Sequence, residues 1–514
     1  MNQGDAAASS GVPTGESGVV AAASGGRLGA IFKAYDVRGV VPAELDPDRA
    51  RAIGFGFAKL CLGVKAGGGT ERGGSGGDRA PAVAEAGDRT RIVVARDMRP
   101  SGTELAGAFM AGAQAAGVSV VDAGLASTDM LYFSAGRLDC PGAMFTASHN
   151  PAQYNGIKLC YEGARPVGQE TGLAEVKQLA EKALETGEHL GPPADGTRRA
   201  QADLLGEFAE HVLSFVDVNR LAELTVAADA ANGMGGLVVP EVFARLPFRL
   251  FLLYPELDGT FPNHPADPIQ EENLADLKKM ILSQGADVGL AFDGDADRVF
   301  LVDENARPVS GSTTTALVAA SMLEKNPGAT ILYNIICSKA VRETIAELGG
   351  IGVRTRVGHS FIKKVMEETG AVFGGEHSGH YYFRDNYRAD SGLIAAMVVL
   401  ELMSRTGRRL SELVAPYDRY TTSGEINLHV EDPARCAAEV ASLVEGRGVD
   451  CDRTDGLTVD FGDWWFNLRP SNTEPLLRLN VEIGKGGDVQ AKVEEVRGMI
   501  EAGSGNGGPE MRLE

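Results

Sequence analysis

Apolar runs alternate with helical patterns through most of the chain. An apolar run at 91–97, RIVVARD, precedes a small-residue helical pattern at 103–117 and a second apolar run at 118–124. The same order returns at 224–255 and at 329–357. Continuous β-branched runs are typical of strands that are buried on both faces, and strands that alternate with helices form layered α/β domains. The pattern therefore predicts three α/β domains.

The pattern changes from about Tyr420 onward. The stretches EINLHV, LTVDFGDWWFNL and LLRLNVEIG alternate apolar and polar residues, and one helical pattern follows at 488–500. This combination predicts a closing α+β domain. We therefore predict the following layout: α/β domains at 29–203, 204–306 and 307–418, an α+β domain at 419–502, disordered or flexible tails at 1–28 and 503–514, and a glycine-rich insertion at 66–88.

Composition and charge narrow the class of protein. The chain is 44% apolar and 23% charged, and it has no uninterrupted apolar run of 18 residues. The N-terminal stretch lacks the basic and apolar regions of a signal peptide, and the six scattered cysteines suggest reduced thiols. We expect a cytoplasmic protein. The net charge of −21 argues against nucleic acid and anionic membranes as partners.

A serine stands in a loop-forming segment, MFTASHNPAQYNGIK, at 144–158. It follows an apolar run, and in α/β sheets ligands bind beyond the carboxyl ends of strands. Ser148 could be a nucleophile or could carry a phosphoryl group, or it could only cap local backbone groups in a turn. A Ser-His-Asp hydrolase is disfavoured, because His149 is expected to point away from Ser148 in an extended segment, and no G-x-S-x-G motif is present.

Three aspartates alternate in VGLAFDGDADRVFLVDE, 288–304. In an extended loop, this spacing would turn Asp293, Asp295 and Asp297 to one side, where their repulsion calls for a cation. Oxygen ligands of this density suit Mg²⁺ or another hard divalent ion. An EF-hand is excluded, because Arg298 stands where that loop needs glycine. A solvated acidic turn is the alternative.

Two later loops carry polar groups that suit a sugar phosphate. In GGEHSGHYYF, a carboxylate and a hydroxyl, Glu376 and Ser378, could bind vicinal sugar hydroxyls, and His380 could transfer a proton. A zinc site at His377 and His380 lacks a third ligand. In the second loop, NLRPSNTEPLLRLN, the guanidinium of Arg469 could bind a phosphate, and Ser471, Asn472 and Thr473 could donate hydrogen bonds to it. The alternative is that this segment only forms a β-turn.

The five motifs AYDVRG, TASHNP, DGDADR, GEHSGH and RPSNTEP, in this order, resemble the α-D-phosphohexomutase family, in particular its phosphomannomutase and phosphomannomutase/phosphoglucomutase members. The resemblance covers about residues 31–500. It implies four domains around a central cleft and an intramolecular phosphotransferase that uses one Mg²⁺ ion and a hexose 1,6-bisphosphate intermediate. The chain would act as a monomer or weak homodimer on small hexose phosphates.

The resemblance also assigns roles to individual residues. Ser148 would carry the phosphoryl group and would bind Mg²⁺ together with Asp293, Asp295 and Asp297. The candidates for proton transfer and charge stabilisation are Arg38, His149, Lys158 and His380. The residues expected to contact substrate are Tyr35, Arg298, His359, Glu376, Ser378, Arg469, Ser471, Asn472 and Thr473. Lys158 is expected to return to the site through a turn at Asn155-Gly156.

The implied reaction consists of two in-line transfers, with the bisphosphate turning end for end between them. Mannose is the expected sugar, with glucose phosphates as further substrates. The alternatives are a phosphoglucomutase, a phosphoglucosamine mutase, and, in a different class, a Ser148-dependent metal phosphatase. The segment YNIICSKA departs from some relatives, because Ile336 stands where a basic residue is expected, and Lys339 is the candidate substitute.

Overall fold

The structure is a computed structural model that describes residues 28–67, 91–430, 432–446, 449, 451–470 and 476–503. The predicted tails, apart from Leu28 and Gly503, and most of the predicted insertion lie outside these residues. The strands form four sheets, three of mixed direction and one antiparallel. The expected class, three α/β domains followed by an α+β domain, is confirmed.

Domain I contains a six-stranded sheet of order β1-β5-β4-β2-β3-β6, in which β4, β2, β3 and β6 are parallel. The apolar run at 91–97 forms the central strand β2. The elements are β1 (Val37–Val40), α1 (Pro47–Gly67), β2 (Arg91–Arg96), α2 (Gly102–Ala115), β3 (Ser119–Leu125), α3 (Thr128–Arg137), β4 (Gly142–Phe145), β5 (Tyr154–Cys160), η1 (Glu162–Ala164), η2 (Gln169–Thr171), α4 (Leu173–Thr186), η3 (Glu188–Leu190) and β6 (Arg199–Gln201).

Domain II contains a five-stranded sheet of order β11-β10-β9-β7-β8. Strand β9 is buried along its whole length, as its continuous apolar run predicts, and it ends directly before Asp293. The elements are α5 (Leu205–Leu213), η4 (Val218–Arg220), β7 (Thr225–Asp229), α6 (Gly235–Phe243), β8 (Arg249–Leu253), η5 (Glu271–Leu274), α7 (Ala275–Gln284), β9 (Val288–Phe292), β10 (Val299–Asp303) and β11 (Pro308–Val309).

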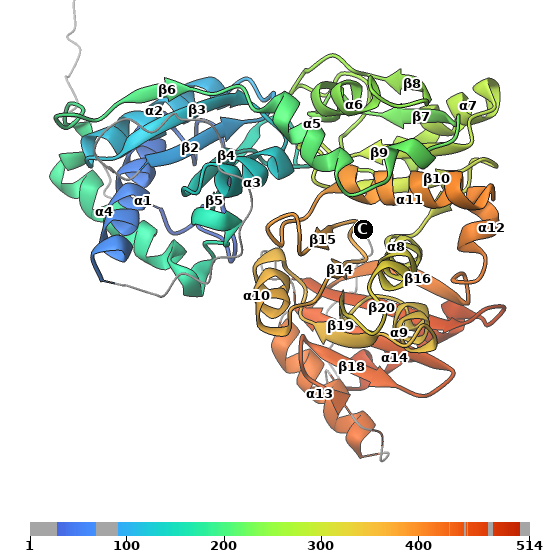
Figure 1. The fold of residues 1–514 in the computed structure, drawn as a ribbon. Helices are drawn as coiled ribbons and strands as arrows, with labels where there is room; N and C mark the ends of the chain where they lie inside the picture. The colour runs from blue at the N-terminus through green and yellow to red at the C-terminus, as the bar shows by residue number, and fades with distance from the viewer. Residues whose placement is uncertain are drawn as a thin grey trace, which may run out of the picture.

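Domain III contains a four-stranded sheet of order β13-β12-β14-β15. Its helix α11 is buried along most of its length and lies beside β10 of domain II (Figure 1). The elements are α8 (Gly311–Lys325), β12 (Thr330–Asn334), α9 (Lys339–Glu347), β13 (Ile351–Thr355), α10 (His359–Thr369), β14 (Phe373–Gly375), β15 (Tyr381–Phe383), α11 (Gly392–Thr406) and α12 (Leu410–Val414).

Domain IV contains an antiparallel five-stranded sheet of order β16-β20-β19-β18-β17. The stretch LTVDFGDWWFNL, which reads as one alternating run, is divided by a turn at Phe461–Asp463 into the hairpin strands β18 and β19. The elements are β16 (Tyr420–His429), α13 (Pro433–Glu445), β17 (Cys451–Asp452), β18 (Leu457–Asp460), β19 (Trp464–Pro470), β20 (Leu476–Gly484) and α14 (Val489–Gly503).

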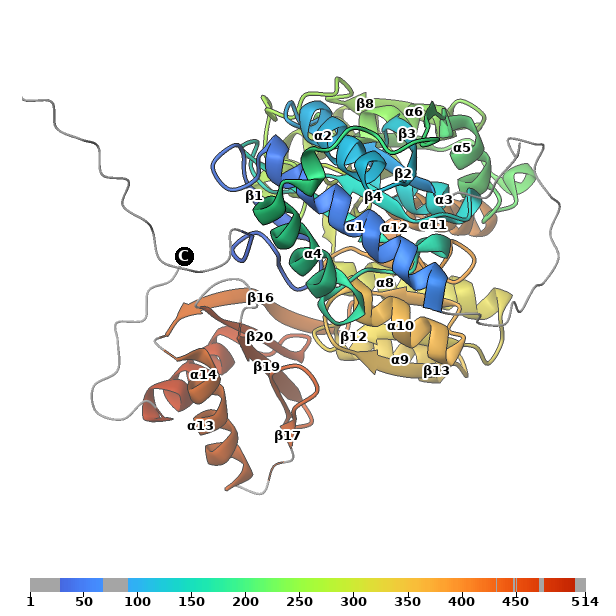
Figure 2. The same ribbon diagram turned by 90° about the vertical axis from the view of Figure 1, so that its left-hand side faces the viewer.

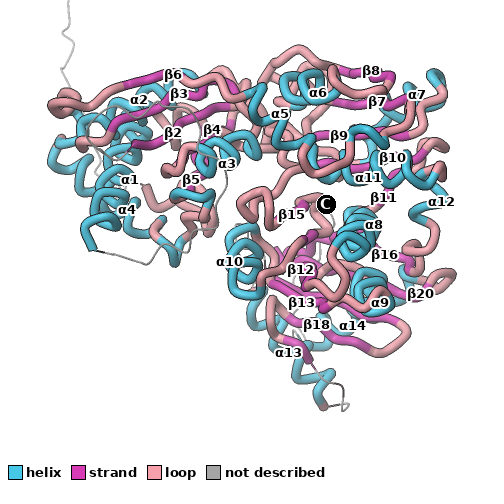
Figure 3. The backbone as a smooth tube through the Cα atoms, viewed as in Figure 1, coloured by secondary structure: helices cyan, strands magenta, loops and turns pink. Residues whose placement is uncertain are grey.

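The apolar cores show which domains are joined tightly. One buried cluster runs through domains I, II and III and includes Phe133, Phe292 and Leu393. Domain IV has its own core, which includes Phe466 and Leu479. It stands apart as a separate lobe in the turned view (Figure 2), and the tube view shows its sheet below the strands of domains I and II (Figure 3). The loops of domains I to III are therefore anchored to one continuous apolar core.

None of the helices in the described ranges is long and apolar enough to cross a membrane. Five of the six cysteines are buried.

Candidate active site

Ser148 lies three residues after β4, at the carboxyl end of the strand. Its backbone adopts a left-handed conformation with φ of 51°, and its amide donates to Thr146 Oγ1 at 2.9 Å. The segment is therefore a tight turn. The residue is only 5% exposed, so its hydroxyl must find partners within the protein.

The three aspartates converge through a turn after β9. The extended loop expected from their alternation is wrong, because Ala296 between them has a φ of 58°. Oxygen atoms of Asp293, Asp295 and Asp297 nevertheless lie within 4.8 Å of one another, and all three residues are buried. Gly294 permits a close approach to the serine loop, since a Cβ there would lie 2.4 Å from the Ser148 carbonyl oxygen.

Hydrogen bonds join the serine, the aspartates and a lysine. Ser148 Oγ donates to Asp293 Oδ2 at 2.7 Å. Lys158 Nζ donates to Asp295 Oδ2 at 2.9 Å and to Asp297 Oδ2 at 2.7 Å. Burial lowers the pKa of Lys158, but the two carboxylates outweigh burial and raise it well above its usual value.

The route by which Lys158 reaches the site differs from the expectation. Asn155 and Gly156 lie inside β5 and do not form a turn, and β5 pairs antiparallel with β4 so that Lys158 stands opposite Met144. The lysine is brought to the aspartates by sheet register. A one-residue slip of β5 would turn it to the other face.

The aspartate cluster fits a divalent cation. Burial and the neighbouring carboxylates raise the pKa of Asp293 to about 7, even with Arg298 beside it. Asp295 Oδ1 and Asp297 Oδ1 are buried and have no hydrogen-bond partner within the described residues. Buried anionic oxygens without partners are costly. A hard cation with oxygen ligands would satisfy them, and Mg²⁺ prefers such ligands.

His149 lies beside Ser148, contrary to the expected outward orientation. Its Nδ1 is 3.2 Å from Ser148 Oγ and accepts a hydrogen bond from Arg298 Nη2 at 2.6 Å. The turn at Ser148 produces this geometry, because sequence neighbours point apart only in extended backbone. Burial, followed by the charges of Arg298 and Arg38, lowers the pKa of His149 well below its usual value, so the ring is neutral. A neutral ring that accepts from arginine at Nδ1 does not form the hydrolase triad.

Arg298 also contacts Asp293 and Ser148. Its Nε donates to Asp293 Oδ2 at 2.9 Å, and its Nη2 lies 3.3 Å from Ser148 Oγ. Its backbone forms an antiparallel bridge with His380 of domain III. Arg298 is only 3% exposed. It therefore links the serine loop, the aspartate turn and the loop of domain III.

His380 is oriented by an acid that we did not single out in the sequence. Its Nδ1 lies 2.8 Å from Asp390 Oδ2 and 3.8 Å from Asp297 Oδ1. Burial lowers the pKa of His380, but Asp297 and Asp390 outweigh burial and raise it. The buried Lys363 lies 3.4 Å from Asp390 Oδ1 and over the ring of Tyr132. Because Nδ1 is directed at Asp390, Nε2 is the ring nitrogen left for a substrate.

Glu376 has three donors around its buried carboxylate. Tyr382 Oη donates to Oε2 at 2.8 Å, while Asn334 Nδ2 and the Gly358 amide donate to Oε1, each at 3.2 Å. Ser378, in the turn that follows, is half-buried. The donors hold the carboxylate in one orientation, as an acceptor of sugar hydroxyls requires.

The remaining predicted residues lie in domains I, III and IV. Arg38 Nη1 donates to Asn150 Oδ1 at 2.6 Å, which places it against the serine loop. Tyr35 Oη donates to the Val357 carbonyl at 3.3 Å. Arg469 pairs with Glu425 at 2.8 Å. His359 begins α10, and Ser471, Asn472 and Thr473 lie outside the described residues.

Lys339, the expected substitute for the basic residue that is missing at Ile336, contacts domain IV. Its Nζ donates to Asp460 Oδ1 at 2.6 Å and to the Gly462 carbonyl at 2.7 Å. Its backbone amide donates to Glu482 Oε1 at 2.9 Å. Lys339 therefore connects domain III to domain IV.

Other residues contribute to the site without belonging to any sequence motif. Thr128 Oγ1, at the first turn of α3, donates to Asp295 Oδ2 at 2.6 Å. Asp390 precedes the N-cap Ser391 of α11. Arg99 Nη2 donates to the carbonyls of Ser148 and Asn150. In the sequence these are an isolated threonine, acid and arginine, and nothing in their spacing distinguishes them from surface residues.

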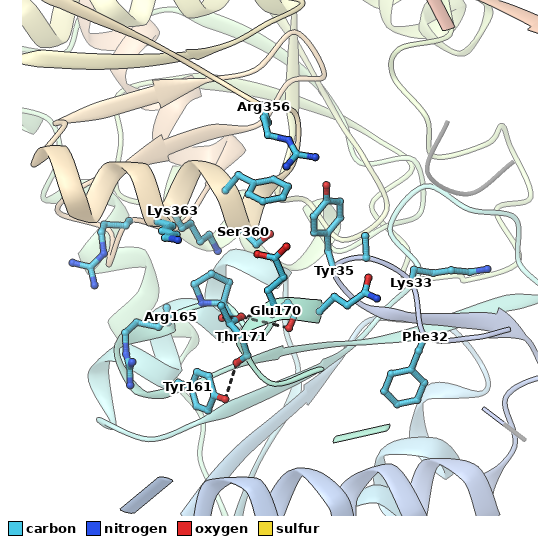
Figure 4. Close-up of a pocket in the computed structure, with 18 of the residues that line it drawn as sticks. Phe32, Lys33, Tyr35, Tyr161, Arg165, Glu170, Thr171, Arg356, Ser360 and Lys363 are labelled. Atoms are coloured by element: carbon cyan, nitrogen blue, oxygen red, sulfur yellow. Dashed lines mark hydrogen bonds between the residues drawn. The ribbon is translucent and has the colours of Figure 1, made fainter. Parts of the chain in front are cut away.

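A cavity of about 970 Å³ lies between domains I and III, next to Tyr35. Figure 4 shows Arg356 and Ser360 facing Glu170 across it, with Tyr35 at one side. Its lining carries charges of both signs, and it contains neither Ser148 nor the aspartates. The cavity is therefore separate from Ser148 and the aspartates, but two of its lining residues, Tyr35 and Lys363, connect it to the site, and Lys363 contacts Asp390.

Comparison with known proteins places this arrangement in a family. Models of the phosphoglucomutase/phosphomannomutase family match all four domains: alpha/beta/alpha domain I at 80–186, domain II at 206–307, domain III at 310–420 and the C-terminal domain at 425–502. The chain is therefore a member of the α-D-phosphohexomutases. It is an isomerase that acts as an intramolecular phosphotransferase of the phosphomannomutase/phosphoglucomutase type.

Individual relatives are similar in sequence or structure to this chain over most of its length. A protein of Xanthomonas campestris pv. campestris named "Phosphohexose mutases" is 38% identical over 91% of this chain and 98% of its own. The phosphomannomutase of Escherichia coli K12 is 37% identical over 88% of this chain and 94% of its own. A solved structure of a phosphoglucomutase/phosphomannomutase family protein from Burkholderia thailandensis is 30% identical, with a TM-score of 0.80, over 94% of this chain and 99% of its own.

Proposed function

We propose that this protein is a phosphomannomutase. It interconverts mannose 6-phosphate and mannose 1-phosphate through a phosphorylated Ser148 and a hexose 1,6-bisphosphate intermediate, and it also accepts glucose phosphates. The observation that carries the proposal is the Ser148 hydroxyl, bound at 2.7 Å to the first of three converging aspartates. The relatives named phosphomannomutase, which are 34–38% identical, support mannose as the sugar.

In the first transfer, the free hydroxyl of a hexose monophosphate attacks the phosphorus carried by Ser148. The new bond joins phosphorus to the sugar oxygen, and the hydroxyl proton passes to His380 Nε2. The bond between phosphorus and Ser148 Oγ breaks, and Oγ takes the electron pair and negative charge beside Arg298 Nη2, which lies 3.3 Å away. Asp390 keeps the imidazole in position for this step. The second transfer reverses these events, with the other phosphate of the reoriented bisphosphate returning to Ser148.

Asp293, Asp295 and Asp297 would hold one Mg²⁺ ion together with Ser148. When bound, the ion offsets the negative charge that develops on the phosphoryl oxygens. Lys158 and Arg298 would add positive charge beside the same phosphoryl group. Arg38, on β1, is held beside the serine loop by its hydrogen bond to Asn150.

The sugar and its second phosphate would be bound by domains III and IV. Glu376 and Ser378 accept and donate to the hydroxyls at O3 and O4, and Tyr35 and His359 border the sugar. The non-reacting phosphate is bound by Arg469, Ser471, Asn472 and Thr473. Every residue invoked comes from one chain, so we expect a monomer or weak homodimer to be active.

Mannose and glucose differ at C2 and share the hydroxyls at O3 and O4. A site that binds those two hydroxyls separates such epimers weakly, and a single contact changes kcat/KM by only about 10- to 200-fold. The test is kcat/KM for mannose, glucose and glucosamine 1-phosphates, with Mg²⁺ and catalytic hexose 1,6-bisphosphate. We expect the highest value for mannose and measurable turnover of glucose. A preference for glucose or glucosamine would assign a phosphoglucomutase or a phosphoglucosamine mutase.

A further inference from the structure

Arg99 is a buried arginine directed at the main chain of the serine loop. It is 2% exposed and follows β2 of domain I. Its Nη2 donates to the carbonyls of Ser148 at 2.9 Å and Asn150 at 2.6 Å. Its Nη1 donates to the carbonyls of Pro151 at 2.8 Å and Tyr154 at 2.9 Å. One planar guanidinium thus binds four carbonyl oxygens across a seven-residue segment.

The arginine is itself held from two sides. Its backbone amide donates to Asp97 Oδ1 at 2.9 Å, and Asp97 Oδ2 lies 3.2 Å from its Nε. From domain II, the Phe261 ring lies 5.2 Å from the guanidinium carbon. Gly259 approaches so closely that a Cβ there would lie 2.6 Å from the Arg99 Cα. The contacts leave the side chain little freedom.

The loop that Arg99 binds requires such support. Ser148 has a positive φ of 51°, a strained backbone conformation for a non-glycine residue that persists only when the surroundings impose it. The Ser148 carbonyl, bound by Arg99, also faces Gly294 of the aspartate turn. Arg99 therefore fixes the residue that carries the reacting oxygen relative to the aspartates, without touching that oxygen.

We propose that Arg99 is a positioning residue for phosphoryl transfer: by binding four carbonyls of the 148–154 segment, it sets the direction of Ser148 Oγ. This inference rests on the proposed function. A lysine in its place keeps the charge but cannot reproduce a planar fork with this many donors. A displacement of about 1 Å at a reacting atom costs on the order of 100-fold in rate.

The test is the single-turnover transfer of a ³²P-labelled phosphoryl group from glucose 1,6-bisphosphate to the full-length protein, for wild type, Arg99→Lys, Arg99→Ala and Phe261→Leu. Arg99→Ala is also measured with added methylguanidinium. Binding of mannose 1-phosphate and the melting temperature are recorded for each variant. Phe261→Leu removes the ring over the guanidinium and leaves its four hydrogen bonds, so it remains informative if the arginine variants fold poorly.

We expect labelling of Arg99→Lys to be about 10- to 100-fold slower than wild type, with sugar phosphate affinity within threefold. Methylguanidinium should restore at least tenfold of the rate lost in Arg99→Ala, and Phe261→Leu should fall between wild type and Arg99→Lys. Labelling of Arg99→Lys within twofold of wild type would overturn this inference alone. So would labelling and affinity that fall together with no rescue. If wild type took no label at Ser148, the proposed function would fall, and this inference with it.

Discussion

Ser148 Oγ donates a hydrogen bond to Asp293 Oδ2 at 2.7 Å, although the two residues are 145 positions apart and belong to different domains. The contact joins the carboxyl ends of β4 and β9. Both strands pack against one apolar core that continues into domain III. The relative position of the phosphoryl carrier and the metal-binding turn is therefore set by the packing of domains I and II.

Replacing Ser148 by alanine tests the carrier directly. The change removes the oxygen proposed to carry the phosphoryl group, and Asp293 keeps its bond from Arg298 Nε at 2.9 Å. We expect mutase activity to fall by about 1,000-fold or more with bisphosphate supplied, and the melting temperature to stay within a few degrees. Ser283→Ala on the exposed surface of α7 is the matched control. Near wild-type activity in Ser148→Ala would refute the carrier role.

Chelation should abolish activity, and Mg²⁺ should restore it. The metal-free protein keeps unpartnered carboxylate oxygens at Asp295 and Asp297. A ligand that binds only the folded state raises stability by mass action. We therefore expect Mg²⁺ to raise the melting temperature of the chelated protein.

Asp295→Asn should lose most of this rise, while Asp258→Asn, in a turn of domain II where its half-buried side chain accepts from Thr260, should keep it. Melting curves over a Mg²⁺ titration measure both. If Mg²⁺ left the melting temperature of the wild-type protein unchanged, the proposed metal site at the three aspartates would be contradicted.

The sugar contact of Glu376 gives a graded prediction. A hydrogen bond to a charged group contributes about 1.5–3 kcal/mol, so Glu376→Gln should lower kcat/KM by roughly 10- to 150-fold. Tyr382→Phe removes one donor to Oε2 and leaves the two donors to Oε1. It should cost about 1 kcal/mol, or roughly fivefold. Equal effects of the two variants, or none for Glu376→Gln, would contradict the assignment.

Asp129 predicts how stability depends on pH. The carboxyl group accepts from Ser127 and from Ser391 of domain III, but burial outweighs these bonds and raises its pKa to about 7. Between an unfolded value near 3.8 and about 7, the folded protein holds an extra proton. Stability from this group is therefore greatest at low pH and declines as the pH rises through this window.

The neutral variant Asp129→Asn should lack this decline. Relative to wild type, we expect its melting temperature to rise between pH 4.5 and about pH 7 and then to level off, with a total effect on the order of 3 kcal/mol. Both proteins are melted side by side across this pH range. A constant difference between them would show that Asp129 does not hold the extra proton.

Much of the fold could be predicted from the sequence, because buried parallel strands leave continuous apolar runs. The runs at 91–97 and 288–292 are β2 and β9, and both deliver functional loops at their ends. The division of 457–468 into β18 and β19 was not visible, because a tight turn at Phe461–Asp463 interrupts an alternation that otherwise continues.

The site was predictable where residue types cluster and not where they act singly. Asp293, Asp295 and Asp297 stand out by their density, and the structure brings them together. The predicted orientation of His149 was wrong, because the orientation depends on the positive φ of Ser148, and nothing in the local sequence indicates that φ. Arg99 was missed for a related reason, since its four partners are backbone carbonyls and leave no mark in the side-chain sequence.

The most direct test follows mannose 1-phosphate by ³¹P NMR in the presence of the full-length protein, Mg²⁺ and a catalytic amount of glucose 1,6-bisphosphate. A phosphomannomutase that shuttles through Ser148 replaces the 1-phosphate signal by that of mannose 6-phosphate, with no accumulation of inorganic phosphate. The Ser148→Ala protein should leave the spectrum unchanged. Release of inorganic phosphate without mannose 6-phosphate would contradict the account and would identify a Ser148-dependent phosphatase instead.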